Sequence, residues 1–350
     1  MGGRNHSERV IGGTPEEQRL AMEELQGVFD ETDPKLVGYE VEKSTDEKAM
    51  IEKVEAIVDE MVEKWGGDPK PVPLKKIQVL KPGAVDATSD GSYGGRGVHK
   101  PLRANIGVER TGSRVGFGSV LAHELFHLKS YKSAQIDKWT KEVDLYRSGF
   151  SMIDRKNPPG EFGKKREYFS DLEEGIVAEC ANRFFDRMKS EPLFEKEMAA
   201  NEKIKQWVLN ACRRREMPKE KLRILEREWK YIPDAEKYAQ QIESFSEVET
   251  EREDFAWGTF SYLYENNKVE IRERYSQRNR LYQLCDEICA KSGGRFVDSE
   301  AVFNEFAKAN FTGNYLTIGR VVDGALGKGS FRRLAEETSG DPRNNDARKP

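Results

Sequence analysis

The sequence contains few cysteines and few histidines, with four of each among 350 residues. Cys180, Cys212, Cys285 and Cys289 are too few to form a disulfide framework in a chain of this length. They also lack the Cys-x-x-Cys spacing that thiolate zinc sites use. We therefore expect four buried, reduced thiols, which is typical of a cytoplasmic protein.

Long apolar runs and export signals are also missing. No stretch approaches the ~18 consecutive apolar residues of a membrane-spanning helix. The first residues, MGGRNHSERVIGG, contain no apolar segment of the kind that a secretory signal needs. We expect a cytoplasmic location and no membrane partner.

The chain has no strong excess of charge of either sign. Its 58 Lys and Arg residues nearly balance its 62 Asp and Glu residues, for a net charge of −4. This balance argues against a dedicated nucleic-acid binder. The basic run at residues 213–215 is interpreted as a solvated helix end, with a phosphate-binding patch as the alternative.

The distribution of turn and apolar residues predicts the fold class. Capping boxes at Thr14–Glu17 and Ser44–Glu47 predict two N-terminal helices. Residues 68–114 are rich in Pro, Gly and short β-type runs, which predicts a small, mainly antiparallel sheet. From Phe117 onwards almost everything is predicted to be helical. The expected helices are 117–131, 166–188, 192–214, 218–230, 233–246, 250–264, 268–291, 298–309, 315–326 and 329–337. This order predicts an α+β fold that is mostly α-helical.

Two of the four histidines lie in the stretch AHELFHL, residues 122–128. On a helix, His123 and His127 project from the same face, close enough to share one ion, and zinc is the ion that this pattern favours. Glu124 can reach a water molecule on that ion and act as a general base. Chance predicts about 0.005 such matches in this chain, and the apolar residues around the motif indicate a buried helix.

A catalytic zinc site needs a third protein ligand and an open position for water. No third histidine follows in HLKSYKSAQIDKW, so a carboxylate on a later helix is the alternative. The stretch DLEEGIVAECANRFF places Glu173 and Glu174 at the start of such a helix. Two carboxylates in a first helical turn would also interact favourably with the helix dipole, without any metal.

HELFH followed by Glu-Glu-Gly-Ile-Val-Ala resembles the gluzincin metallopeptidases, over roughly residues 100–190. The resemblance implies a thermolysin-like core, a zinc cofactor and a peptide or protein substrate. It implies His123, His127 and Glu174 as the metal ligands, with Glu124 as the base. Glu174 is preferred over Glu173 because glycine follows it directly, as in the Glu-Gly form of the motif.

The resemblance implies further parts of an active site. Ala178 stands where many gluzincins have an aspartate that orients a ligand histidine, so Glu179 or Asp171 is expected to orient it. Tyr168 is the expected oxyanion stabiliser, with His99 and Tyr315 as alternatives. An edge strand ahead of the motif helix is expected to bind the substrate backbone, and either ANIGVER or GRGVHKP would supply it.

The function expected from these observations is that of a zinc metallopeptidase. One alternative is a catalytically silent protein of gluzincin fold that binds a protein partner, although the retained Glu124 argues against it. Another is a regulatory protease that acts on a DNA-binding repressor, although no clear helix-turn-helix is present. The helical part after Ser190 is expected to form half of the cleft or a cap over it. The expected organisation is a helical segment (1–67), a zincin catalytic core (68–190), a helical subdomain (191–338) and a disordered tail (339–350).

Overall fold

A computed structural model of the chain describes residues 8–85, 97–100, 105–138, 140–154, 166–229, 235–265 and 275–338. The predicted tail, residues 339–350, lies outside the described residues. The N-terminal and central helices are α1 (Pro15–Asp30), α2 (Pro34–Val37), α3 (Thr45–Lys64), α5 (Arg114–Lys129), α6 (Ser170–Met188) and α7 (Glu195–Arg214), with a 3-10 turn at Leu74–Lys76. The later helices are α8 (Lys219–Glu228), α9 (Ala235–Phe245), α10 (Glu249–Glu265), α11 (Tyr275–Lys291), α12 (Ser299–Thr312), α13 (Tyr315–Leu326) and α14 (Ser330–Glu337).

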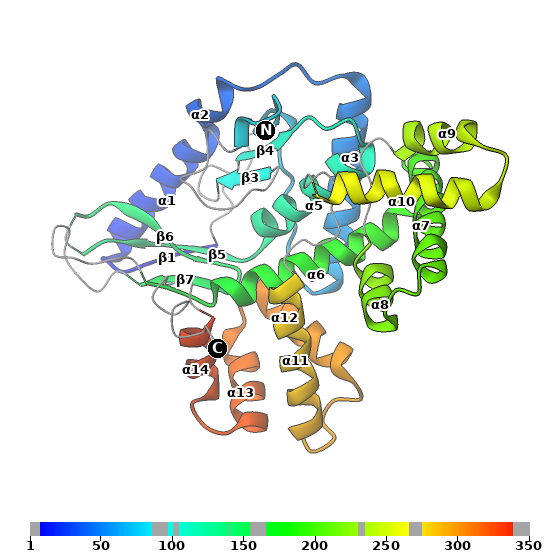
Figure 1. Ribbon diagram of the computed structural model, residues 1–350. Coiled ribbons are helices and arrows are strands. Elements are labelled where there is room, and N and C mark those ends of the chain that lie inside the picture. The colour runs from blue at the N-terminus through cyan, green and yellow to red at the C-terminus, as the bar shows by residue number, and fades with distance from the viewer. Residues whose placement is uncertain are drawn as a thin grey trace.

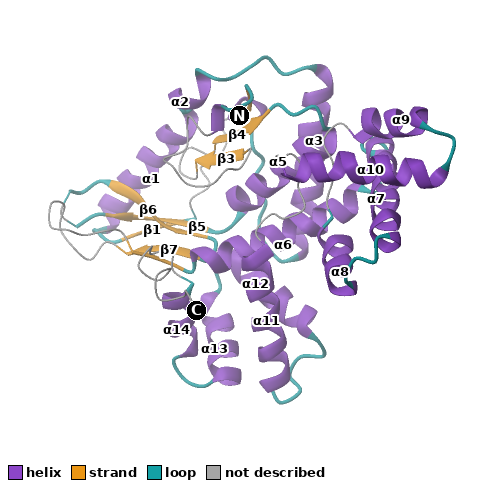
Figure 2. Ribbon diagram, in the orientation of Figure 1, coloured by secondary structure: helices purple, strands orange, loops and turns teal. Residues whose placement is uncertain are grey.

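The described chain is mostly helical with two small sheets, which confirms the α+β class in its coarse form (Figure 2). The strands are β1 (Arg9–Ile11), β2 (Ile77–Leu80), β3 (Gly97–Lys100), β4 (Asn105–Glu109), β5 (Lys132–Ile136), β6 (Val143–Ser148), β7 (Ser151–Asp154) and β8 (Arg166–Tyr168). Both predicted capping boxes are present: Thr14 and Glu17 exchange hydrogen bonds of 2.7 and 3.2 Å, and Ser44 and Glu47 exchange bonds of 2.7 and 3.1 Å.

The sheet ahead of the motif helix has three strands in the order β2-β4-β3. It is mixed rather than mainly antiparallel, because β2 runs parallel to β4 and β3 antiparallel to it. The stretch ANIGVER supplies the central strand β4, and GRGVHKP supplies the edge strand β3. The outer side of β2 is partly covered, since the Val41 amide donates to the Val79 carbonyl (2.8 Å). Of the two candidate edges, β3 is therefore the one at the margin of the sheet.

A second sheet lies where the sequence predicted only helices or loops. It has five strands in the order β1-β5-β6-β7-β8, and all of its pairs are antiparallel except β1 with β5. Four of these strands occupy residues 132–154 and 166–168, so the prediction that nearly everything after Phe117 is helical was wrong there. The apolar alternation of these strands is interrupted by two buried cations, Lys132 and Arg147, which hides the strand pattern.

The motif helix α5 lies at the centre of the molecule (Figure 1). It packs against α3, α6, β3 and β4, and every residue from Val115 to Lys129 is buried. This confirms the expected buried helix. Helices α11 and α12 pack against α6 on the side away from α5. Helices α13 and α14 continue this layer, which we call the C-terminal layer.

A second hydrophobic core lies outside this central assembly. We call helices α7–α10 the outer lobe, because the C-terminal half of α7 packs with α9 and α10 around residues such as Trp207, Trp229 and Phe260. The basic run does end a helix, as predicted, because α7 ends at Arg214. Among the described helices, none combines the length and apolar character that a membrane span requires.

Candidate metal centre

Three predicted ligands meet between helices α5 and α6. Nε2 of His127 lies 3.1 Å from Nε2 of His123 and 2.9 Å from Oε1 of Glu174. Nε2 of His123 lies 3.9 Å from Oε2 of Glu174. One ligand atom from each residue lies within 4.8 Å of the others. Glu124, one residue after His123 on the same helix, is 7% exposed.

The spacing of these atoms fits a tetrahedral zinc site. Zinc bonds of about 2.0–2.1 Å in a tetrahedron separate neighbouring ligand atoms by about 3.3 Å. The two contacts of His127, 2.9 Å to Oε1 of Glu174 and 3.1 Å to Nε2 of His123, are slightly shorter than that value, and the 3.9 Å from His123 to Oε2, the other oxygen of Glu174, is longer. Two imidazole nitrogens and one carboxylate oxygen form the three-ligand set of open, catalytic zinc sites. The glutamate side chain is 21% exposed, against 3% for His127, so the cluster is reached from the Glu174 side.

Glu173 supports the site from behind His127. Its Oε1 lies 2.8 Å from Nδ1 of His127, and both side chains are at least nine-tenths buried. We assign the imidazole proton to Nδ1, which donates to the carboxylate, so that Nε2 directs its lone pair toward the other two ligands. The two neighbouring glutamates therefore have different roles: Glu174 joins the ligand cluster and Glu173 orients a ligand.

The expectation that Glu179 or Asp171 orients a histidine was wrong. Glu179 accepts hydrogen bonds from Arg183 (2.9 Å) and pairs with Arg278 (3.1 Å). Asp171 pairs with Arg280 at 2.9 Å. Both carboxylates therefore pair with arginines of α11.

Buried charges from other elements fix both ends of the motif helix. At its start, Glu197 of α7 accepts hydrogen bonds from the amides of Arg114 (2.8 Å) and Val115 (3.2 Å), and burial raises the pKa of this carboxyl group. At its end, the ammonium group of Lys132 donates to the carbonyls of His127 (3.0 Å) and Ser130 (3.1 Å). Each charge has the sign that complements the helix dipole. Burial lowers the pKa of Lys132 to about 7.

Tyr168, the expected oxyanion stabiliser, makes no described contact with the ligand cluster. Tyr168 is half-buried on β8 and packs against the main core, and within the described residues no hydrogen bond joins it to the ligand cluster. The alternative Tyr315 donates its hydroxyl proton to the Gly149 carbonyl (2.6 Å), and burial raises its pKa. The side chain of His99, on β3, is outside the described part of the structure.

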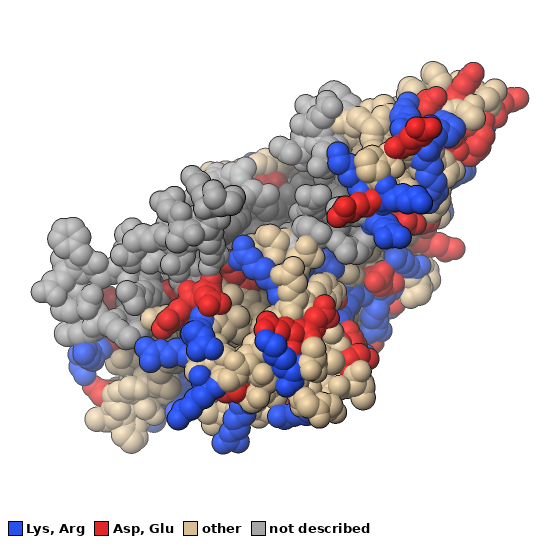
Figure 3. All heavy atoms as spheres, turned by 60° about the horizontal axis from the view of Figure 1, so that its bottom comes forward, with Lys and Arg blue, Asp and Glu red and all other residues tan. Residues whose placement is uncertain are grey.

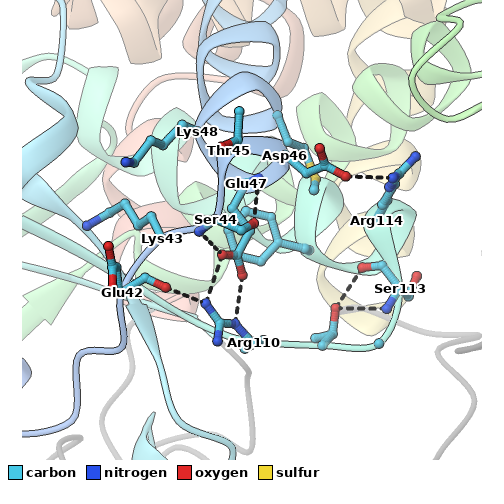
Figure 4. A pocket seen from close by; sticks show the side chains of 14 residues that line it. Glu42, Lys43, Ser44, Thr45, Asp46, Glu47, Lys48, Arg110, Ser113 and Arg114 are labelled. Carbon is cyan, nitrogen blue, oxygen red and sulfur yellow. Dashed lines mark hydrogen bonds and ion pairs between the residues drawn. The ribbon is translucent and has the colours of Figure 1, made fainter.

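A pocket of about 660 Å³ opens at a different place, between the starts of α3 and α5 (Figure 4). Both of its arginines are already paired, since Arg110 lies 2.8 Å from Glu47 and Arg114 lies 2.9 Å from Asp46. The three metal-cluster residues are not among the described residues that line it. The pocket and the cluster are therefore separate features of the described structure.

The surface charges match the balanced composition. On the described part of the face in Figure 3, basic and acidic side chains are interspersed. The basic run at the end of α7 is paired with acids of α10, because Arg214 and Arg215 each lie 3.0 Å from Asp254. This pairing supports the interpretation of the run as a solvated helix end.

Searches against protein-family models, curated proteins and solved structures found no match for this chain.

Proposed function

We propose that this protein is a zinc-dependent metallopeptidase. The observation that carries the proposal is the meeting of His123, His127 and Glu174, with Glu124 beside them on the motif helix. When bound there, zinc would lower the pKa of a coordinated water to about 7 and polarise the scissile carbonyl.

The protein's own residues would transfer the proton and hold the ligands in position. Glu124 would take the proton from the attacking water and pass it to the leaving amine, which is the role of a general base and then a general acid. Glu173 would hold the proton on Nδ1 of His127, so that the imidazole keeps the tautomer that binds a metal through Nε2. The buried Lys132 would keep the last turn of α5 in place beneath His127.

The three-stranded sheet supports a peptide as the substrate. The edge strand β3 contacts the motif helix, and an extended peptide can pair with such an edge through main-chain hydrogen bonds. Main-chain hydrogen bonds do not depend on the side chains of the peptide, but they require it to be extended. We therefore expect cleavage of peptide or protein substrates in an extended conformation.

Substitution of the base tests the proposal. The Glu124→Gln variant should keep zinc and lose peptide hydrolysis by about 100- to 10,000-fold, because the amide cannot accept the proton. Zinc-loaded wild type and variant would be incubated with a mixture of unfolded peptides, and the products identified by mass spectrometry. Zinc content measured on the same samples controls for loss of the metal. Full activity of Glu124→Gln would refute the base assignment, and a zinc-loaded wild type that cuts no peptide would favour a partner-binding protein.

A further inference from the structure

Helix α6, which carries both glutamates, begins without a cap of its own. Its N-cap residue is Phe169, which has a left-handed backbone (φ 62°) and no capping side chain. The amides at this end instead reach the last carbonyls of α14: Asp171 donates to Thr338 (3.1 Å) and Phe169 donates to Ala335 (3.3 Å). The positive end of one helix dipole therefore meets the negative end of another. The two glutamates lie within one turn of this junction.

The backbone of helix α11 lies close to α6 at Gly175, the residue after Glu174. A Cβ atom placed on Gly175 would lie 2.9 Å from the backbone oxygen of Gln277 and 3.2 Å from its carbonyl carbon. Backbone atoms cannot move aside as a flexible side chain can. The glycine that follows Glu174 is therefore required by the packing of α11, which gives the Glu-Gly pair a physical reason.

The end of α12 and the start of α13 hold the turn at Gly149, which packs against Glu173. The Asn310 side chain accepts a hydrogen bond from the Phe150 amide (3.0 Å), and Tyr315 binds the Gly149 carbonyl. A Cβ atom placed on Gly149 would lie 3.1 Å from Cγ of Glu173 and 2.3 Å from the Asn310 side-chain oxygen. The turn, Glu173 and Asn310 therefore fill one space without a gap.

Ion pairs add two further attachments along α6. Arg278 pairs with Glu179, whose side chain is 4% exposed, and Arg183 of α6 forms two hydrogen bonds with Glu300 of α12 (2.6 and 2.7 Å). The C-terminal layer thus contacts α6 at its start, beside Glu174, and again about one and a half and two and a half turns further along. The metal histidines are on α5, so the distance between α5 and α6 decides whether three ligands can share one ion.

We propose that helices α11–α14 position Glu174 and Glu173. Tight zinc binding then depends on the packing of this C-terminal layer against α6. The proposal rests on the metal site of the proposed function but not on peptide hydrolysis. It assigns Gly175 as a positioning residue, and it makes the end of α14 a point at which zinc binding can be controlled.

The test is zinc affinity in the full-length Gly175→Ala variant. The added methyl group should push α11 away beside Glu174 and weaken zinc binding about 10- to 100-fold, as the loss of outer-shell support does. Competition with a chromophoric chelator would measure this affinity, and thermal unfolding of the metal-free protein would measure general stability. Gly258→Ala is the matched control, because nothing lies within 4 Å of a Cβ atom on this glycine in α10. Equal zinc affinity in Gly175→Ala and wild type would overturn the proposal.

Hydrogen exchange of the wild type gives a second test that does not depend on a variant folding. Adding zinc should slow amide exchange in α6 and also in α11–α14, because coupling between two regions is reciprocal. The amides of α9 and α10 should be unaffected. Protection confined to α5 and α6 would overturn the proposal. A wild type that binds no zinc would refute the metal site and this inference together, whereas zinc-dependent protection without hydrolysis would refute only the peptidase function.

Discussion

The metal-site region and the outer lobe are built from different kinds of contact. Around α5 and α6, the buried side chains include two histidines, several glutamates and two lysines, and His127, Lys129 and Lys132 are bonded across to other elements. The outer lobe has no histidine, and it is organised around aromatic and aliphatic side chains such as the stacked pair Trp229 and Phe260. Most of its ion pairs, such as Arg215 with Asp254, are exposed, and Arg214 with the buried Glu253 is an exception.

On the proposed function, this difference separates the region expected to bind the metal from a region expected to contribute stability. Burying a charged or polar group costs free energy unless it is paired, so such groups persist where they orient something. The lobe contacts the motif helix through the start of α7, where Glu197 caps the helix and Met198 packs into the main core. The comparison therefore predicts that changes near α5 and α6 alter metal binding, and that changes within the lobe alter stability alone.

Removal of a ligand histidine should have the largest effect. In His127→Ala, the cluster loses the nitrogen that lies closest to both other ligands, and Glu173 loses its partner. We expect a loss of zinc affinity greater than the ~10- to 100-fold that follows loss of an outer partner. Chelator competition would measure it, with His6→Ala as a control histidine. A variant that still holds zinc with wild-type affinity would contradict the ligand assignment.

The two adjacent glutamates should rank next, and differently from each other. Glu174→Ala removes a ligand, whereas Glu173→Ala removes only the support of His127 and should weaken zinc binding by about 10- to 100-fold. Glu173→Gln should lose less, because its amide oxygen still accepts a hydrogen bond from Nδ1–H of His127. Measuring all three variants under the same conditions decides the roles. If Glu173→Ala loses more zinc affinity than Glu174→Ala, the two assignments must be exchanged.

Truncation in the lobe core should leave the metal site almost unchanged. Trp207 is 4% exposed and packs in the second core, so Trp207→Ala should lower stability by about 3–5 kcal/mol. Unfolding followed by tryptophan fluorescence and denaturant titration would measure this change, and zinc affinity would be measured in parallel. Trp207→Phe serves as the conservative control. A large loss of zinc affinity in the alanine variant would show that the outer lobe and the metal site form one cooperative unit. That result would contradict the prediction that changes within the lobe alter stability alone.

Local patterns predicted the parts of the structure that depend on near neighbours. The capping boxes at Thr14 and Ser44 and the helical pairing of His123 with His127 involve residues three or four apart, so the sequence contains both partners. Most helix boundaries after Ser190 agree within a few residues for the same reason.

The parts that depend on distant partners were not predicted. Lys132 and Arg147 are both buried; Arg147 donates to the distant Gly313 carbonyl (2.9 Å), whereas Lys132 donates to carbonyls at the end of α5. Strands β5 and β6 were missed with them. The role of Glu173 depends on how α6 faces α5, which neighbouring residues do not specify. The requirement for glycine at 175 likewise comes from α11, about a hundred residues later.

The most direct test of the central claim is the metal content of the purified, undialysed protein by inductively coupled plasma mass spectrometry. The account predicts about one zinc ion per chain, because the three ligand atoms already meet at distances that suit the metal. A protein that holds no zinc, even after incubation with zinc at neutral pH, would contradict it.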